Sequence, residues 1–301
     1  MLTAALLALC PVATAPQETE DFLSGYLDFL DGVELVSPWF DGLSLGLQLE
    51  RRVETMENGQ WTTTGGKSTT IAVKAVRSTD GGRWLLDLTM QDSRSLLADA
   101  ADAGAVAHRI AGLADGVTFS MLCDDYGVPD TVVEVETTVA ALRQRRAALI
   151  AGLPAEIRPV AAELVPDHLA VVDEVIDLCE AWCIPIGYYL TEGQPLEFSY
   201  YDEPAWSVVN TSREVTYRLE EHDVLAGICK VSCDDRPGFV DSPLVERLED
   251  AGLPGSTPLG PVIVTDWDFD LETNLPTSVK RVVLQRTGQV STRETLTLAV
   301  R

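Results

Sequence analysis

The segment from Asp266 to Glu272 alternates strictly between acidic and large apolar side chains, and this alternation limits the fold more strongly than any other feature. Successive side chains of a β-strand point to opposite faces, whereas those of a helix repeat every 3.6 residues. Only a strand therefore places all the carboxylates on one side and Trp267, Phe269 and Leu271 on the other. A strand with one buried and one solvated face is typical of antiparallel sheets.

The carboxylates of this strand allow two interpretations, a calcium site or a solvated face. Calcium sites gather six or more oxygens around one point. Carboxylates on one face of a strand lie about 6.6 Å apart in a row and do not converge. Lys280 and Arg281, on the expected neighbouring strand, would balance part of their charge. We therefore interpret the row as a solvated face and predict neither a metal site nor a cofactor.

Strand patterning recurs along the chain between turn sequences such as Asn58-Gly59, which favours a β-hairpin. The further segments expected to be strands are 43–56, 68–78, 83–91, 117–123, 131–136, 195–201, 213–221, 226–232, 278–286 and 290–300. Helical periodicity is found in 19–33, 95–113, 138–183 and 241–253, and prolines interrupt the third of these segments. We predict an α+β protein with curved antiparallel sheets in two similar halves and helices packed across or between them.

The two β-rich parts of the chain resemble each other. The turns around Pro129 and Pro276 have similar sequences and lie 147 residues apart (276 minus 129). Antiparallel hairpins of similar length also resemble one another without a duplication, so both explanations stay open. We expect a signal peptide over 1–15, a first β-rich half with an N-terminal helix over 16–152, and a helical segment with the second β-rich half over 153–301.

The first fifteen residues are apolar and uncharged, and they end in Ala13-Thr14-Ala15. A small residue, any residue and a second small residue before a polar segment are typical of a signal-peptide cleavage site. The basic start of such a peptide is missing, so an upstream start or an atypical signal are the two explanations. Lipid attachment at Cys10 is disfavoured because the large Leu9 precedes it. We predict export and cleavage after Ala15.

The charge of the chain restricts its partners. The net formal charge is −25, from 47 acidic and 22 basic residues. Such a chain repels phosphate backbones and anionic lipid surfaces. Beyond the first residues, no run approaches the roughly 20 apolar residues of a membrane helix. We therefore predict no nucleic-acid partner and no membrane span.

The strand, turn and strand from Phe269 to Val279, with helices expected over an antiparallel sheet, resemble exported bacterial proteins with lipoprotein-carrier-like (LolA/LolB-like) sheets. Uncharacterised exported proteins of that layout are equally similar. The matched turn is a small part of the chain and contains no functional residue to carry over. The resemblance implies a half-barrel whose concave face holds an apolar ligand or a segment of a protein partner.

The segment Gly42-Leu43-Ser44-Leu45-Gly46 matches the G-x-S-x-G nucleophile elbow of serine hydrolases. That mechanism needs a buried strand before the serine, a helix after it, and a histidine and an acid. Here a strand pattern follows Ser44, and the three histidines are isolated from one another along the chain. We therefore predict no catalytic residue and keep a secreted serine hydrolase using Ser44 as the alternative.

Four cysteines form two C-x-x-x-C pairs, Cys179 with Cys183 and Cys229 with Cys233. The first pair is expected on a helix, about 6 Å apart along its axis. The second is expected on a strand, about 13 Å apart and too distant to bond to each other. The inner side of the helix is expected to carry Leu169, Val172, Ile176, Cys179 and Cys183. We predict at most one disulfide, between one helix cysteine and one strand cysteine, with buried free thiols and a metal or redox site as alternatives.

The leading functional hypothesis is a non-enzymatic binding or scaffolding protein, periplasmic or extracellular, that holds an apolar ligand or a partner segment on a sheet face. The alternatives are the serine hydrolase and a structural partner in an envelope complex. A binding protein would contain a large apolar cavity without clustered catalytic groups, whereas an enzyme would bring a nucleophile, a histidine and an acid together. A structural partner would expose an apolar patch or a free sheet edge.

The export prediction is tested by N-terminal sequencing of the protein secreted by its own host. The mature chain is expected to begin near Pro16, because the preceding alanines fit a signal peptidase. An intact Met1 on a cytoplasmic protein would contradict both the export and the oxidising environment on which the disulfide depends.

Overall fold

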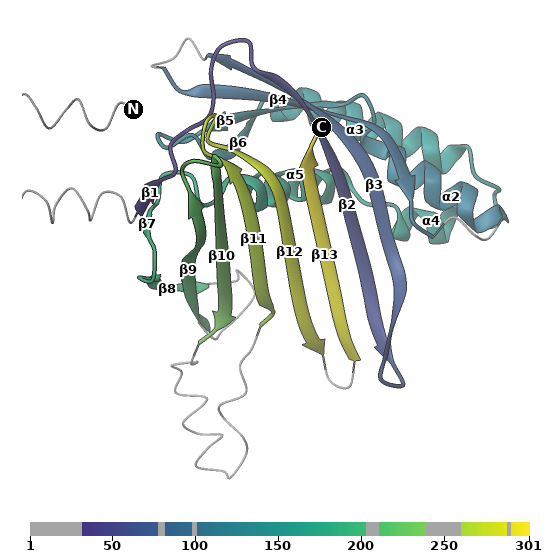
Figure 1. Cartoon of the computed structure of the whole chain (residues 1–301). Helices are drawn as coiled ribbons and strands as arrows, with labels where there is room; N and C mark the ends of the chain where they lie inside the picture. Colours follow the sequence, from purple (N-terminus) through teal and green to yellow (C-terminus); the bar gives the residue numbers. More distant parts are fainter. Residues whose placement is uncertain (1–31, 78–81, 98–100, 203–210, 239–259, 288–289) are drawn as a thin grey trace, which may run out of the picture.

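The structure, a computed structural model, describes residues 32–77, 82–97, 101–202, 211–238, 260–287 and 290–301 (Figure 1). The predicted signal peptide and the predicted helix over 241–253 lie outside these residues, as does most of the predicted helix over 19–33. Val33 lies in strand β1 (Gly32–Glu34), which pairs with β7 (Tyr189–Thr191). The prediction that the N-terminal helix includes Val33 is wrong, because the register of this strand sets Val33 opposite Leu190.

The other strands of the described residues form one eleven-stranded antiparallel sheet, so the prediction of an α+β protein built mainly on antiparallel sheet is confirmed. The strand order is β6-β5-β4-β3-β2-β13-β12-β11-β10-β9-β8, and the sheet is open because its edge strands β6 and β8 do not pair with each other. The strands are β2 (Ser44–Glu57), β3 (Gln60–Arg77), β4 (Trp84–Ser95), β5 (Thr118–Cys123), β6 (Pro129–Val133), β8 (Leu196–Asp202), β9 (Thr211–Asp223), β10 (Ile228–Pro237), β11 (Val262–Asp270), β12 (Leu275–Thr287) and β13 (Val290–Val300).

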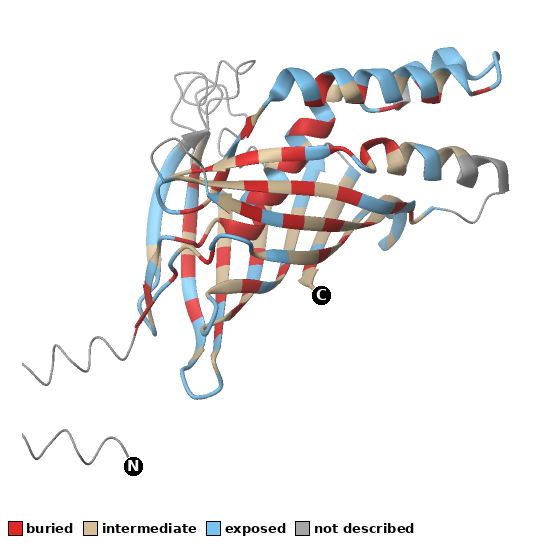
Figure 2. Ribbon diagram, turned by 90° about the horizontal axis from the view of Figure 1, so that it is seen from above, coloured by how far each residue is buried: buried red, intermediate tan, exposed pale blue. Residues whose placement is uncertain are grey.

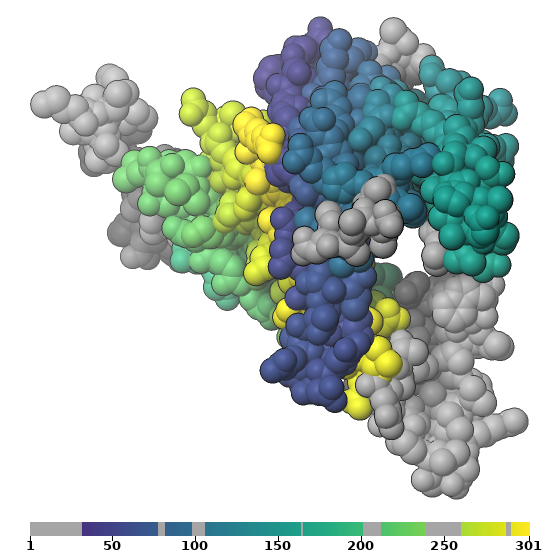
Figure 3. Space-filling model, turned by 90° about the vertical axis from the view of Figure 1, so that its right-hand side faces the viewer, coloured from purple at the N-terminus to yellow at the C-terminus, as the bar shows by residue number. Residues whose placement is uncertain are grey.

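The pairing of β13 with β2 joins the two β-rich parts of the chain into that single sheet. The last strand lies beside the first long one, with Leu298 opposite Leu49 and both side chains buried. Figure 3 shows the corresponding surfaces, purple-blue and yellow, side by side. The similarity of the two halves stays a prediction.

The helices of the described residues are α2 (Ala101–Ala111), the short 3-10 helix η1 (Gly112–Ala114), α3 (Val135–Ala151), α4 (Arg158–Leu164) and α5 (His168–Cys183). Helix α5 crosses one face of the sheet, behind β11, β12, β13 and β2 in Figure 1, and we call this face the inner face. None of the described helices is both long and apolar enough to span a membrane. The sheet and α5 therefore face each other across the interior of the protein.

In β11, the apolar and acidic side chains point to opposite faces of the sheet, as their alternation in the sequence predicted. Trp267 and Phe269 are buried on the inner face at 2% exposure, while Asp266 is exposed on the outer face opposite Lys280. Figure 2 shows the same alternation of buried and more exposed positions along other strands. Arg281, however, lies opposite Thr265 on the inner face, because adjacent residues of a strand point to opposite sides. It therefore does not belong to the solvated row.

Several strand ends differ from the sequence-based prediction, and two of them have a clear local cause. Strand β11 ends at Asp270, because the carboxylate of this residue accepts hydrogen bonds from the backbone of Glu272 and the hydroxyl of Thr273 at 2.9 Å each. Strand β6 ends at Val133, because Glu134 adopts a left-handed conformation with φ of 53° and the chain turns there into α3.

Helix α5 is fixed to the sheet by two buried indole groups. Trp182 donates to the backbone carbonyl of Pro276 on β12 at 3.2 Å, and Trp267 on β11 donates to the carbonyl of Ala181 at 2.8 Å. The ring of Trp182 also packs edge-on against Trp39, with centroids 5.4 Å apart. A hydrogen bond in the core fixes a position more strictly than apolar contact alone, because an unpaired buried polar group is costly.

The replacement Trp182→Phe is therefore expected to lower the free energy of unfolding by about 2–4 kcal/mol, through the lost volume and the unpaired Pro276 carbonyl. The matched control is Trp61→Phe, which weakens the contact of Arg293 over the ring at 4.7 Å because phenylalanine attracts a cation less than tryptophan does, and it should cost at most about 1 kcal/mol. Urea unfolding followed by circular dichroism measures both. Equal losses for the two variants would show that α5 is not anchored through Trp182.

Candidate ligand-binding site

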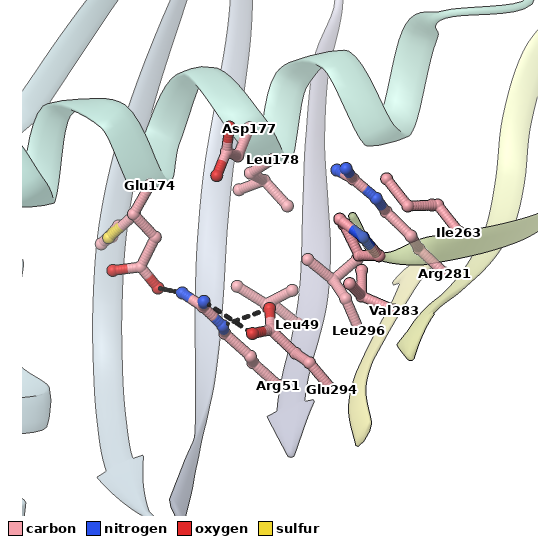
Figure 4. Close-up of a pocket in the computed structure, with 12 residues that line it drawn as sticks. Leu49, Arg51, Glu174, Asp177, Leu178, Ile263, Arg281, Val283, Glu294 and Leu296 are labelled. Carbon is pink, nitrogen blue, oxygen red and sulfur yellow. Dashed lines mark hydrogen bonds and ion pairs between the residues drawn. The ribbon is translucent and has the colours of Figure 1, made fainter. Parts of the chain in front are cut away.

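A cavity of about 230 Å³ lies between α5 and the inner face of the sheet (Figure 4). We call it the central cavity. Its lining residues are Leu49, Arg51, Met90, Glu174, Asp177, Leu178, Pro261, Ile263, Arg281, Val283, Glu294 and Leu296. Apolar side chains form most of the wall, and the charged groups come from both α5 and the strands.

The periodicity of each element brings these residues to one place. On the strands they are separated by two positions, as Leu49 and Arg51 are on β2, so both point to the inner face. On α5, Glu174 and Leu178 are separated by four positions and occupy the same side of the helix. The cavity therefore combines a helix stripe with inner positions of several strands.

Arg51 is the centre of an ion-pair network between the sheet and α5. Its guanidinium lies 2.7 Å from a carboxylate oxygen of Glu294 on β13 and 3.2 Å from Glu174 on α5. The ammonium of Lys67 on β3 lies 2.9 Å from the same oxygen of Glu174. Figure 4 shows Arg51 reaching from the sheet to both carboxylates. Two cations and two anions thus neutralise one another inside the molecule.

The pKa of Glu174 reflects this network. Burial raises it, but the charges and hydrogen bonds of Lys67 and Arg51 lower it more, so the pKa lies below its ordinary value. Asp177 has no such partner, and burial raises the pKa of its carboxyl even though Arg281 acts in the opposite direction. Glu174 is therefore held in the charged form, whereas charge on Asp177 is disfavoured.

Two further cavities adjoin the central one along α5. One of about 220 Å³ has many aromatic residues in its wall and shares Ile263 and Arg281 with the central cavity; we call it the aromatic cavity. The other, of about 320 Å³, lies toward α2 and shares Arg51 and Glu174 with the central cavity. The three spaces therefore follow one another beneath α5, with charged groups where they meet.

The paired cysteines lie on the expected elements, Cys179 and Cys183 on α5 and Cys229 and Cys233 on β10. All five described cysteines are buried free thiols, and the pKa of Cys123, Cys229 and Cys233 is raised by burial to about 12 in each case. Such thiols stay protonated and are poor nucleophiles. Cys179 and Cys183 interact electrostatically with Cys123 on β5, and Cys233 lies in the wall of the aromatic cavity.

Helix α5 buries Val172, Cys179 and Cys183 of the predicted stripe, and Ile176 is partly buried. Leu169 is 55% exposed, so its placement on the inner side is wrong. Val171, Val175, Leu178 and Trp182 are buried in addition to both cysteines, because β6 and α3 also contact the helix. The disulfide between Cys179 or Cys183 and Cys229 or Cys233 stays a prediction.

Ser44 lies at the start of β2, exposed and opposite Lys74, and a strand follows it rather than a helix. Among the described histidines, His108 accepts a hydrogen bond from the backbone of Ser95 and His168 contacts Arg143. In the part of the chain that the structure describes, no three histidine, cysteine or acidic side chains form a group able to hold a metal ion.

The ion-pair network itself was not found by sequence reasoning. A signal was nevertheless available, because Arg51 continues the inner, apolar positions of Leu47 and Leu49, and Glu294 precedes Leu296 and Leu298 in the same way. A charge in phase with an apolar face indicates a buried pair.

The comparisons with known proteins give distant similarities. No protein-family model and no curated protein sequence matches the chain. Among solved structures, it is similar to lipovitellin, in a structure that concerns its lipid–protein interactions, with a TM-score of 0.44 and 9% identity over 87% of this chain. The chain spans 25% of the length of that lipovitellin chain. It is also similar to MucB in complex with MucA and to the MucA/MucB complex of Pseudomonas aeruginosa, each with a TM-score of 0.15 and 12% identity. Each of these alignments covers 85% of this chain and 89% of the matched chain.

Replacing Glu174 by glutamine is expected to destabilise the protein by about 1–2 kcal/mol near neutral pH, because Arg51 and Lys67 lose a shared partner. A carboxyl whose pKa is lowered by folding stabilises the protein above its unfolded pKa, about 4.3 for glutamate, and this contribution disappears as the pH falls through the folded value. The difference between wild type and variant should therefore vanish in acid. Thermal unfolding at several pH values measures it.

The control for this experiment is Glu50→Gln, which removes an exposed pair with Arg52 and should change stability by less than about 0.5 kcal/mol at every pH. A Glu174→Gln variant as stable as wild type at neutral pH would contradict the role of the network.

Proposed function

We propose that the protein is a non-enzymatic binding protein that acts outside the cytoplasm and holds an apolar ligand in the cavities beneath α5. The observation that supports this most directly is the succession of three cavities along one helix. Ligand sites are concave and mostly apolar, with a few polar groups that fix orientation. The export signal in the sequence supports the location.

The wall of the central cavity is suited to an apolar guest. Leu178 is buried at 2% exposure, while Val283 and Leu296 on the opposite wall keep part of their surface free. Covering such surface stabilises a complex by about 25 cal/mol for each Å² removed from water. The charges of Arg51, Glu174 and Glu294 are already paired, so an apolar guest need not leave them without partners.

The alternative of a serine hydrolase finds no support at Ser44. Its hydroxyl is on an exposed strand start, whereas a nucleophile elbow needs a following helix. No described histidine lines the three cavities beneath α5. The site therefore offers surface and shape rather than the nucleophile, base and acid of a hydrolase.

The experiment fills the central cavity from the sheet side. Val283→Trp places an indole in the cavity and should reduce the affinity for dodecyl maltoside at least tenfold, because the guest and the indole compete for the same space. The matched control is Val282→Trp on the same strand, whose side chain lies on the outer face and should leave binding unchanged. Isothermal titration calorimetry below the micelle concentration measures the affinity.

Circular dichroism and thermal unfolding check that both tryptophan variants are folded, and Leu296→Phe repeats the test with a smaller increase in volume. Wild-type affinity in a folded Val283→Trp variant would overturn the proposal, as would failure of the wild-type protein to bind both dodecyl maltoside and dodecylphosphocholine.

A further inference from the structure

The wall of the aromatic cavity includes four aromatic rings that pack together, three of them nearly parallel and one at a steep angle to two of the others. Phe198, Tyr217 and Trp267 stack on one another, with neighbouring ring centroids 5.9 and 6.2 Å apart and ring planes inclined by only 19° and 29°. Tyr188, from the segment between α5 and β7, stands at 73° to Phe198 and to Tyr217. The rings come from four separate segments of the chain, so the tertiary structure alone creates this corner.

Two carboxylates lie at the same cavity. Asp235 on β10 is held by Arg213 at 2.7 Å and accepts a hydrogen bond from the hydroxyl of Tyr200. Glu180 on α5 is exposed at the rim, and its carboxylate has no ion pair or hydrogen bond with any other described side chain. A corner of ring faces beside carboxylates is a favourable environment for an organic cation, because the π faces and the acids attract positive charge together.

Arg281 occupies the boundary between the aromatic cavity and the central cavity and lines both. Figure 4 shows its side chain extending from β12 toward α5. Asp177 and Glu180 act on it electrostatically, but among the described residues no carboxylate lies within 4 Å of its guanidinium. Its planar array of donors is therefore available to a phosphate or carboxylate group of a ligand.

Three features thus follow one another along α5: an apolar cavity, a guanidinium without a close partner, and an aromatic corner with carboxylates. We propose that the ligand is an amphiphile with a zwitterionic head, whose tail occupies the central cavity, whose anionic group binds Arg281, and whose alkylated ammonium enters the aromatic cavity. Phosphocholine has this order of charges. The inference rests on the proposed function and adds the chemical class of the ligand.

The alternative of a purely anionic ligand fits the site less well. It would use Arg281 but would set negative charge near Asp177 and Glu180, neither of which forms an ion pair with a described residue. A purely cationic ligand would use the corner and repel Arg281. Only a ligand with both charges, in that order along its length, satisfies the acids and the guanidinium together.

The test titrates the full chain with dodecylphosphocholine, dodecyl maltoside and tailless phosphocholine, all below micelle concentrations, by isothermal titration calorimetry. Dodecylphosphocholine is expected to bind at least tenfold more tightly than dodecyl maltoside, and phosphocholine alone much more weakly than either. Equal affinity of dodecylphosphocholine and dodecyl maltoside would overturn the head-group assignment and leave the proposed function intact. Failure of both dodecyl compounds to bind would overturn the proposed function as well.

Two other results distinguish a zwitterionic amphiphile from a soluble zwitterion and from an anionic amphiphile. If phosphocholine alone binds as tightly as dodecylphosphocholine, the head-group site is supported and its ligand is a soluble zwitterion, while the apolar role of the central cavity is refuted. If dodecyl phosphate binds more tightly than dodecylphosphocholine, the site is an anion site and the zwitterion proposal fails.

Variants locate the preference within the site. Phe198→Leu and Arg281→Gln are each expected to reduce the ratio of the two dodecyl affinities at least fivefold, by removing one ring face and the guanidinium. The matched controls are Phe40→Leu, an exposed ring that lines none of the three cavities, and Arg52→Gln on the outer face. Because Phe198 is 37% exposed, its replacement should not prevent folding, which thermal unfolding verifies. An unchanged ratio in both folded variants would refute the proposal.

Discussion

The pairing of β13 with β2 is the contact on which the remaining architecture depends. It converts two β-rich segments into one continuous sheet and places Leu296 directly beside Arg51. Without it, the inner face beneath α5 would be divided and Arg51 would lack Glu294, which lies 243 residues away in the sequence. The backbone hydrogen bonds of that strand pair and the buried Leu49–Leu298 contact therefore support both the fold and the site.

Helix α5 shows how cavities remain between a helix and the sheet on which it packs. Its indole bonds fix the helix at one end, and the Glu174 network joins it to the sheet along its length. Between these attachments the helix does not close completely on the sheet, and cavities remain. Since the cavity walls are set by backbone hydrogen bonds and ion pairs, their shape is largely formed before any ligand binds.

The fold class and the positions of most strands could be predicted from local patterns, because the alternation of a half-buried strand is a property of consecutive residues. Trp267 and Phe269 were correctly assigned to a buried face by this rule alone. The exact ends of strands were not predictable in this way where a single side chain or backbone angle sets them. The carboxylate of Asp270 and the left-handed Glu134 moved strand ends by two and three residues, respectively.

The sequence by itself determined that this chain is an acidic, mainly antiparallel α+β protein, and that Ser44 lies on a strand and not in a nucleophile elbow. Only the tertiary structure decided which side chains meet beneath α5, because strand order and helix rotation depend on contacts between residues far apart in the sequence, such as Arg51 with Glu294 and Trp182 with Pro276. Arg281 illustrates the difference. Its sequence neighbours suggested a surface cation, yet one step along β12 separates the solvated face from the inner one, and that step places it between two cavities.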